Sequence, residues 1–73
     1  MVGKILSNIR KIKKLNQKQV ADYLSVEENA ILNYEREYSK ITFETAIKFI
    51  HSCKFDIQIV NKENNEVYTI DEL

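Results

Sequence analysis

Residues 16–35, which read NQKQVADYLSVEENAILNYE, decide the fold, because two short helical patterns meet there at a tight turn. Asn16 is suited to cap the first pattern, since its side chain can accept a hydrogen bond from a free amide of the first turn. Ser25 ends this pattern. Three residues give it one narrow apolar face: Val20, Ala21 and Leu24. We therefore predict a helix over residues 17–24.

The second pattern predicts a helix over residues 27–36, opened by two glutamates whose charges suit the positive end of a helix. One side of this helix should lie against a core: Ala30, Ile31, Tyr34 and Glu35. The other side should be free: Glu28, Asn29, Leu32, Asn33 and Arg36. Asn29 and Asn33 place two carboxamides one turn apart on this free side. That geometry is suited to reading base edges in the major groove of DNA.

The stretch resembles the helix-turn-helix of the phage repressor and Cro family, the Xre-type class of bacterial DNA-binding domains. The resemblance covers roughly residues 3 to 55. Five residues of the stretch carry it: Gln17, Ala21, Val26, Ile31 and Glu35. It also implies a partly buried ion pair between Arg10 and Glu35. The fold that it implies is mostly α, with a repressor-like core of four to five helices.

The same resemblance implies double-stranded DNA as a partner and assigns a role to each candidate contact. It places the start of the second helix deepest in the groove, with bases read by Glu27, Glu28, Asn29 and Asn33. Leu32 would lie against a thymine methyl group, and Gln17 at the groove edge against a phosphate or an outer base. Phosphate contacts would come from Lys18, Arg36 and Lys40. A glutamate can accept a hydrogen bond from cytosine N4, but two carboxylates oppose binding unless both find donors.

Two further helices should flank this motif. A period of 3.6 predicts a helix over residues 3–14, with Leu6 beside its main apolar stripe. That stripe is formed by Ile5, Ile9 and Ile12. After a loop over residues 37–42, Thr42 is suited to cap a last helix. The wide apolar face of that helix should complete the core.

From Phe55 the apolar period changes from 3.6 to 2, which predicts a β-hairpin with a polar turn over residues 61–65. We therefore divide the chain into a helix-turn-helix domain, residues 1–55, and a hairpin, residues 56–73. A hairpin alone is only marginally stable in water, so it should pair with a second copy or pack on the helices. It loosely resembles the dimerising strands of HipB-type antitoxins. The expected dimerisation residues are Phe55, Ile57, Ile59, Val67, Tyr68 and Ile70.

The composition limits what the chain can do. Net charge is zero, but residues 1–21 carry six basic and no acidic side chains, which is compatible with phosphate contact. The lone Cys53 excludes an internal disulfide and suggests a reducing compartment. No apolar run approaches a membrane span and no signal peptide is evident, so we expect a cytoplasmic protein. We expect no cofactor and no metal, since His51 is a single histidine without an evident second ligand.

Three functional hypotheses remain at this point. The first is a sequence-specific, repressor-like transcriptional regulator that binds DNA as a homodimer, with an antitoxin that regulates its own operon as its variant. The second is a helix-turn-helix fold used for protein binding, which the two glutamates suggest. The third is an enzyme, which the sequence argues against, because it lacks a nucleophile–base arrangement and a phosphate-binding glycine loop.

Overall fold

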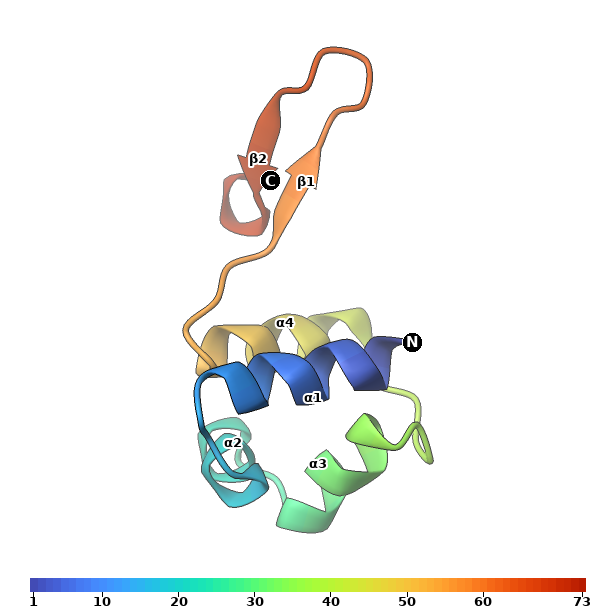
Figure 1. Ribbon diagram of the computed structural model, residues 1–73, viewed down its shortest axis with the longest axis vertical. Helices are drawn as coiled ribbons and strands as arrows, with labels where there is room; N and C mark the ends of the chain where they lie inside the picture. Colours follow the sequence, from blue (N-terminus) through green and yellow to red (C-terminus); the bar gives the residue numbers. More distant parts are fainter.

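The computed structural model describes residues 1–73 as four α-helices followed by a two-stranded antiparallel hairpin (Figure 1). The helices are α1 (Val2–Ile12), α2 (Gln17–Leu24), α3 (Glu28–Glu35) and α4 (Phe43–Ser52). The strands are β1 (Gln58–Val60) and β2 (Val67–Thr69), and a 3-10 turn, Ile70–Glu72, follows them. The predicted fold class, a mostly α repressor-like core with a C-terminal hairpin, is confirmed.

The turn between α2 and α3 forms as the sequence predicts. Asn16 caps α2, and its side chain accepts a hydrogen bond from the Gln19 amide, while the Gln19 side chain accepts one from the Asn16 amide. This reciprocal capping box satisfies two amides that the helix leaves free. At the other end of α2, Ser25 is left-handed, with φ 58° and ψ 42°. A left-handed residue other than glycine costs about 1 kcal/mol, so this tight turn is formed against local strain.

The predicted ends of α3 are each one residue too long. Glu27 is the N-cap residue in extended conformation, and Arg36 is the C-cap residue. The Glu27 side chain makes no capping hydrogen bond. Both of its carboxylate oxygens therefore remain free beside the first turn of α3.

Helix α1 differs from the prediction in its end and in its buried face. It ends at Ile12, because the chain turns at Lys14, which has a positive φ of 57°. The residue that enters the core is Leu6, which is 1% exposed, whereas Ile5 and Ile12 are 48% and 66% exposed. The main apolar stripe of α1 is therefore partly exposed, since α1 turns its Leu6 side to the other helices.

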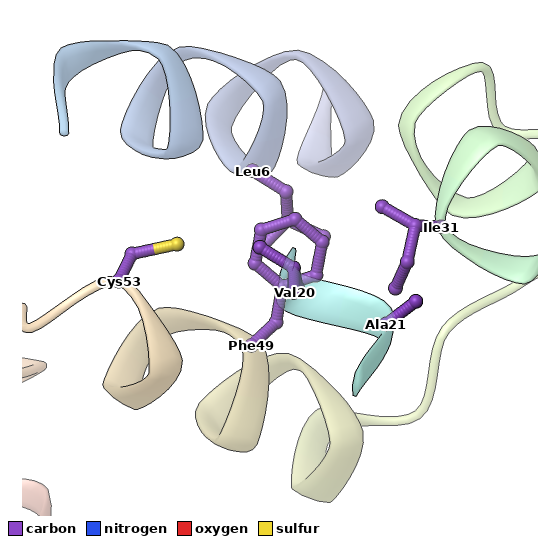
Figure 2. Close-up of a cluster of buried hydrophobic side chains, with 6 residues drawn as sticks. All are labelled: Leu6, Val20, Ala21, Ile31, Phe49 and Cys53. Carbon is purple, nitrogen blue, oxygen red and sulfur yellow. The ribbon is translucent and has the colours of Figure 1, made fainter. Parts of the chain in front are cut away.

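The core lies where α1, α2, α3 and α4 meet, and the ring of Phe49 is at its centre (Figure 2). Phe49 and Ile31 are fully buried. Thr42 caps α4 as predicted, since its hydroxyl accepts a hydrogen bond from the Thr45 amide at 3.1 Å. The buried apolar residues are Leu6, Val20, Ala21, Ile31, Phe49 and Cys53.

The single glycine of the chain lies inside α1 and allows α3 to approach closely. A Cβ atom at Gly3 would clash with the Glu35 carbonyl oxygen and would be 2.8 Å from the Tyr34 carbonyl oxygen. Both are backbone atoms at the end of α3, so neither can move away without moving the helix. Gly3 therefore fixes how near α1 comes to the end of α3.

Every position with a left-handed backbone conformation is occupied by a residue other than glycine. Four of them follow the ends of the helices and one lies in the hairpin turn: Lys14, Ser25, Glu37, Lys54 and Asn65. Asparagine tolerates this conformation better than the others, which suits Asn65 to the hairpin turn. At the helix ends the left-handed residue lies within a local closing hydrogen bond, such as those from the Leu15 amide to the Arg10 carbonyl oxygen and from the Val26 amide to the Ala21 carbonyl oxygen.

The hairpin extends away from the helices, and α1 and α4 lie between it and α3 (Figure 1). Gln58, Ile59 and Val60 pair with Thr69, Tyr68 and Val67. The strands are shorter than the predicted runs, but they pair within one chain. They make their main contacts with each other and not with a helix. None of the helices has the length and apolar character that crossing a membrane requires.

Candidate nucleic-acid interface

The free side of α3 lies at the end of the molecule opposite to the hairpin (Figure 1). Glu28 and Asn29 are exposed, and Leu32 and Asn33 are half-buried. Ile31 is fully buried on the other side of the same helix. The structure therefore separates a core side from a free side of α3, and the two asparagines are one helical turn apart on the free side.

The back of α3 is fixed by a nearly buried ion pair. Arg10 Nε donates to Glu35 Oε2 at 2.6 Å, and its Nη2 donates to Glu35 Oε1 at 2.9 Å. The side chains of Arg10 and Glu35 are only 11% and 6% exposed. The remaining nitrogen, Nη1, donates to the Leu15 carbonyl oxygen at 2.8 Å. One planar guanidinium thus connects α1, the α1–α2 turn and α3.

This network sets the charge states of its members. Burial alone would raise the pKa of Glu35, but hydrogen bonds from Arg10 and Gln17, together with the Arg10 charge, lower it overall from its ordinary value of 4.5. The hydrogen bond to Glu35 raises the pKa of Arg10. Both residues are therefore charged at neutral pH, and the pair stabilises the folded state as an ion pair.

Gln17 connects the network to the free surface. Its Nε2 donates to Glu35 Oε1 at 3.2 Å, and its side chain also lines a shallow hollow with three residues of α3. Those residues are Glu28, Asn29 and Leu32. Gln17 was expected at the groove edge, but the sequence carries no signal for its hydrogen bond to Glu35. Only one of the two N–H groups of the Gln17 side-chain amide is used by Glu35, so its second N–H and its carbonyl oxygen are left for other contacts.

The acidic side chains at the start of α3 have no partner within the chain. Glu27 and Glu28 are exposed and take part in no ion pair. Their charge favours the positive N-terminus of α3 but repels phosphate groups. Any contact between this end of α3 and DNA must therefore supply a donor to each carboxylate or leave it in water.

The basic residues expected to meet phosphates are all exposed. Lys18, in α2, lies 3.5 Å from Asp22 in an ion pair one turn along the helix. Arg36 follows α3 directly, and Lys40 lies in the α3–α4 loop. The three cations therefore reach solvent from α2, from the C-cap of α3 and from the loop after it.

The six residues expected to mediate dimerisation do not form one surface. Ile59 and Tyr68 pair across the strands on one side of the hairpin, whereas Val67 pairs with Val60 on the other side. All four are exposed. The other three expected residues are half-buried near the base of the hairpin: Phe55, Ile57 and Ile70.

Comparison with known proteins agrees with this geometry. A family model described as helix-turn-helix matches residues 6–59 of the chain. No curated protein and no solved structure matches the chain significantly. The matched range begins within α1, includes the whole of α2, α3 and α4, and ends within β1.

Proposed function

This chain belongs to the Cro/C1-type helix-turn-helix family of DNA-binding proteins, and we propose that it is a repressor-like, sequence-specific transcriptional regulator that binds DNA as a homodimer. In this proposal α3 enters the major groove. One observation carries it: α3 has a free side bearing two carboxamides, and its other side is fixed to α1 by a bidentate, nearly buried ion pair.

Rigid support of α3 matters because base readout depends on position. A carboxamide that makes two hydrogen bonds to adenine must approach the base edge at a fixed distance and angle. Arg10 bonds to Glu35 in α3 and to the Leu15 carbonyl oxygen before α2, and Gln17 in α2 bonds to the same carboxylate. The three bonds hold α2 and α3 in one orientation, so Asn29 and Asn33 are presented together.

Affinity and base preference would come from different residues. Lys18, Arg36 and Lys40 are exposed cations beside α3, and phosphate contacts by such residues supply affinity that falls as salt rises. Asn29, Asn33 and Leu32 would supply discrimination between bases. Glu27 and Glu28 lower nonspecific affinity, and a carboxylate that accepts from cytosine N4 adds preference at that position.

The hairpin supports the homodimer in this proposal. Ile59, Val60, Val67 and Tyr68 are exposed on its two sides, and neither strand packs mainly on a helix. An apolar two-stranded hairpin of this kind is marginal without a partner. A second copy would cover it, and a two-fold dimer would place two α3 helices about 34 Å apart in successive major grooves.

Selection from a random DNA library, at low and at moderate salt, tests this function. We expect enrichment of a near-palindromic site with wild-type protein. Asn33→Ala should lose about 1–3 kcal/mol of base preference at one position in each half-site. Asn8→Ala is the matched control, because Asn8 is an exposed asparagine of α1. An unchanged profile with Asn33→Ala would remove this residue from the reading set, and no enrichment from folded protein would refute the proposal.

A second candidate function follows from the acidic start of α3. Glu27 and Glu28 are exposed and unpaired, so they suit a basic surface of a protein partner, of which a toxin is one kind. Salt separates the two functions when DNA is the ligand: phosphate contacts give a steep, linear fall of log K with log salt. Folded protein that binds no DNA at low salt, with or without Glu27→Gln and Glu28→Gln, would favour this second function.

A further inference from the structure

Three metal-ligating side chains meet at the place where the hairpin joins the helices. They come from the last turn of α4, from the linker before β1 and from the 3-10 turn after β2: His51, Asp56 and Asp71. One ligand atom of each lies within 4.8 Å of the other two. Asp71 is twenty positions after His51 in the sequence, so the hairpin must fold back for the three to meet.

The imidazole of His51 is the unusual member of this cluster. Its Nε2 atom is buried and has no hydrogen-bond partner in the protein. The Asp56 carboxylate oxygen is 3.8 Å from this atom, which is too far for a hydrogen bond. Buried polar atoms normally have a partner, because an unpaired one loses its interaction with water and gains nothing in return. This nitrogen therefore has an unused lone pair or proton, with the Asp56 carboxylate as its nearest charged neighbour.

The space between the three groups is open enough to admit an ion. A hollow at this place is lined by His51, Lys54, Phe55, Asp56 and Asp71. The Asp56 side chain is 70% exposed, so its carboxylate can move. Ligand atoms of a tetrahedral zinc ion at bond lengths of about 2.0–2.1 Å are roughly 3.3 Å apart. The three ligand atoms, now within 4.8 Å of one another, must therefore move closer together when an ion binds.

We propose that His51, Asp56 and Asp71 form a binding site for a divalent ion of the zinc type. One imidazole nitrogen and two carboxylate oxygens are a donor set that such ions accept, and three protein ligands leave a fourth position for water. Calcium and magnesium prefer oxygen ligands alone, so the histidine favours zinc over them. Lys54 also lines the hollow, so a bound ion would lie near one lysine side chain as well as the two carboxylates.

The site would join the two parts of the chain. His51 belongs to α4, whereas Asp71 follows β2, and the strands otherwise make their main contacts with each other. A bound ion would therefore hold the base of the hairpin against the end of α4. The direction of the hairpin, and with it the relative position of two paired copies, would depend on the ion.

Calorimetric titration of the tag-free full chain with zinc chloride tests the site. Cobalt(II) is used in place of zinc to obtain an absorption spectrum that reports the ligands. We expect one ion for each chain and a cobalt spectrum of tetrahedral nitrogen and oxygen ligation. Asp71→Asn and Asp56→Asn should each weaken binding at least tenfold, since changing even outer partners of metal sites typically costs about 10- to 100-fold. Glu72→Gln is the matched control, because Glu72 is exposed beside Asp71 and is not part of the cluster.

Three results would overturn the proposal. They are the absence of stoichiometric binding, binding that Asp56→Asn and Asp71→Asn leave unchanged, and strong thiolate-to-cobalt absorption, which would assign the ion to the buried Cys53. Both aspartates are exposed, so neither variant removes a core contact. The experiment contains no DNA, so its failure leaves the proposed function standing.

Discussion

The helices and the hairpin are held together in different ways. The four helices share a buried core around Phe49, and the Arg10–Glu35 pair connects their ends. The hairpin has no buried residue, and its strands make their main contacts with each other. Burial can stabilise the helices within one chain, whereas the hairpin depends on its hydrogen-bond ladder and on whatever covers it. Substitutions in the two regions should therefore affect different measurements.

The largest effect should follow removal of Arg10. Arg10→Ala leaves the nearly buried Glu35 carboxylate without its partner, and such a loss typically costs about 3–5 kcal/mol of unfolding free energy. Arg10→Lys should retain only part of this unfolding free energy. An ammonium group cannot make the two parallel hydrogen bonds to the Glu35 carboxylate and the third to the Leu15 carbonyl oxygen. Urea unfolding measures both. Equal stability of the lysine variant and wild type would show that only the charge matters.

The same pair makes stability depend on pH. The pKa of Glu35 is lower in the folded chain than its ordinary value of 4.5. The stabilisation is therefore fully present above the unfolded pKa and is lost as pH falls through the lower, folded pKa. Acid titration of unfolding free energy should show this loss below about pH 4.5, and Glu35→Gln should remove that part of the dependence. An unchanged acid profile in the variant would assign the dependence to other carboxylates.

A smaller effect should follow a single added carbon at Gly3. Gly3→Ala directs a methyl group at backbone oxygens of α3, and overpacking of this kind costs about 1–3 kcal/mol. Helix propensity alone would make the alanine variant more stable by about 1 kcal/mol. A loss of stability would therefore show that the close approach of α1 and α3 outweighs helix propensity. Thermal unfolding measures it, with Asn8→Ala as the control on the same helix. A stabilised Gly3→Ala variant would show that α1 and α3 can separate without loss.

The smallest effect on stability should come from the hairpin. Ile59→Lys replaces an exposed side chain, so the unfolding free energy of the monomer should change by no more than about 0.5 kcal/mol. Sedimentation should nevertheless show loss of the proposed dimer, while Glu63→Lys, at the exposed turn, should leave it intact. A variant that still sediments as a dimer would place the interface on the helices, where Ile5 and Ile12 are exposed.

The local features of the fold were predictable because they depend on neighbouring residues. The bounds of α2 follow from Asn16 and Ser25, and both behave as their chemistry indicates. The start of α4 follows from Thr42 in the same way. The paired strands are shorter than the alternating runs, since residues 55–57 serve as the linker between α4 and β1.

The features that depend on distant contacts were not predictable. In α1 the stripe of isoleucines and the stripe through Leu6 are both helical, and only the position of the other helices decides which is buried. Arg10 and Glu35 were paired through the resemblance to a family and not from the residues themselves. The approach of Asp56 and Asp71 to His51 depends on how the chain returns after β2, for which no sequence period gives a signal.

The left-handed residues at the helix ends have a consequence for how the chain can evolve. Lys14, Ser25, Glu37 and Lys54 each occupy a position that glycine adopts without strain. A change to glycine at Lys14, Ser25 or Lys54 is a simple route to added stability, whereas at Glu37 it would also remove the ion pair with the N-terminal amine. None of the four lies on the free side of α3. Substitutions on the free side of α3 would usually lower the stability of the fold. Stabilising changes to glycine elsewhere would offset that loss. The chain therefore retains room to acquire a new DNA target without losing its fold.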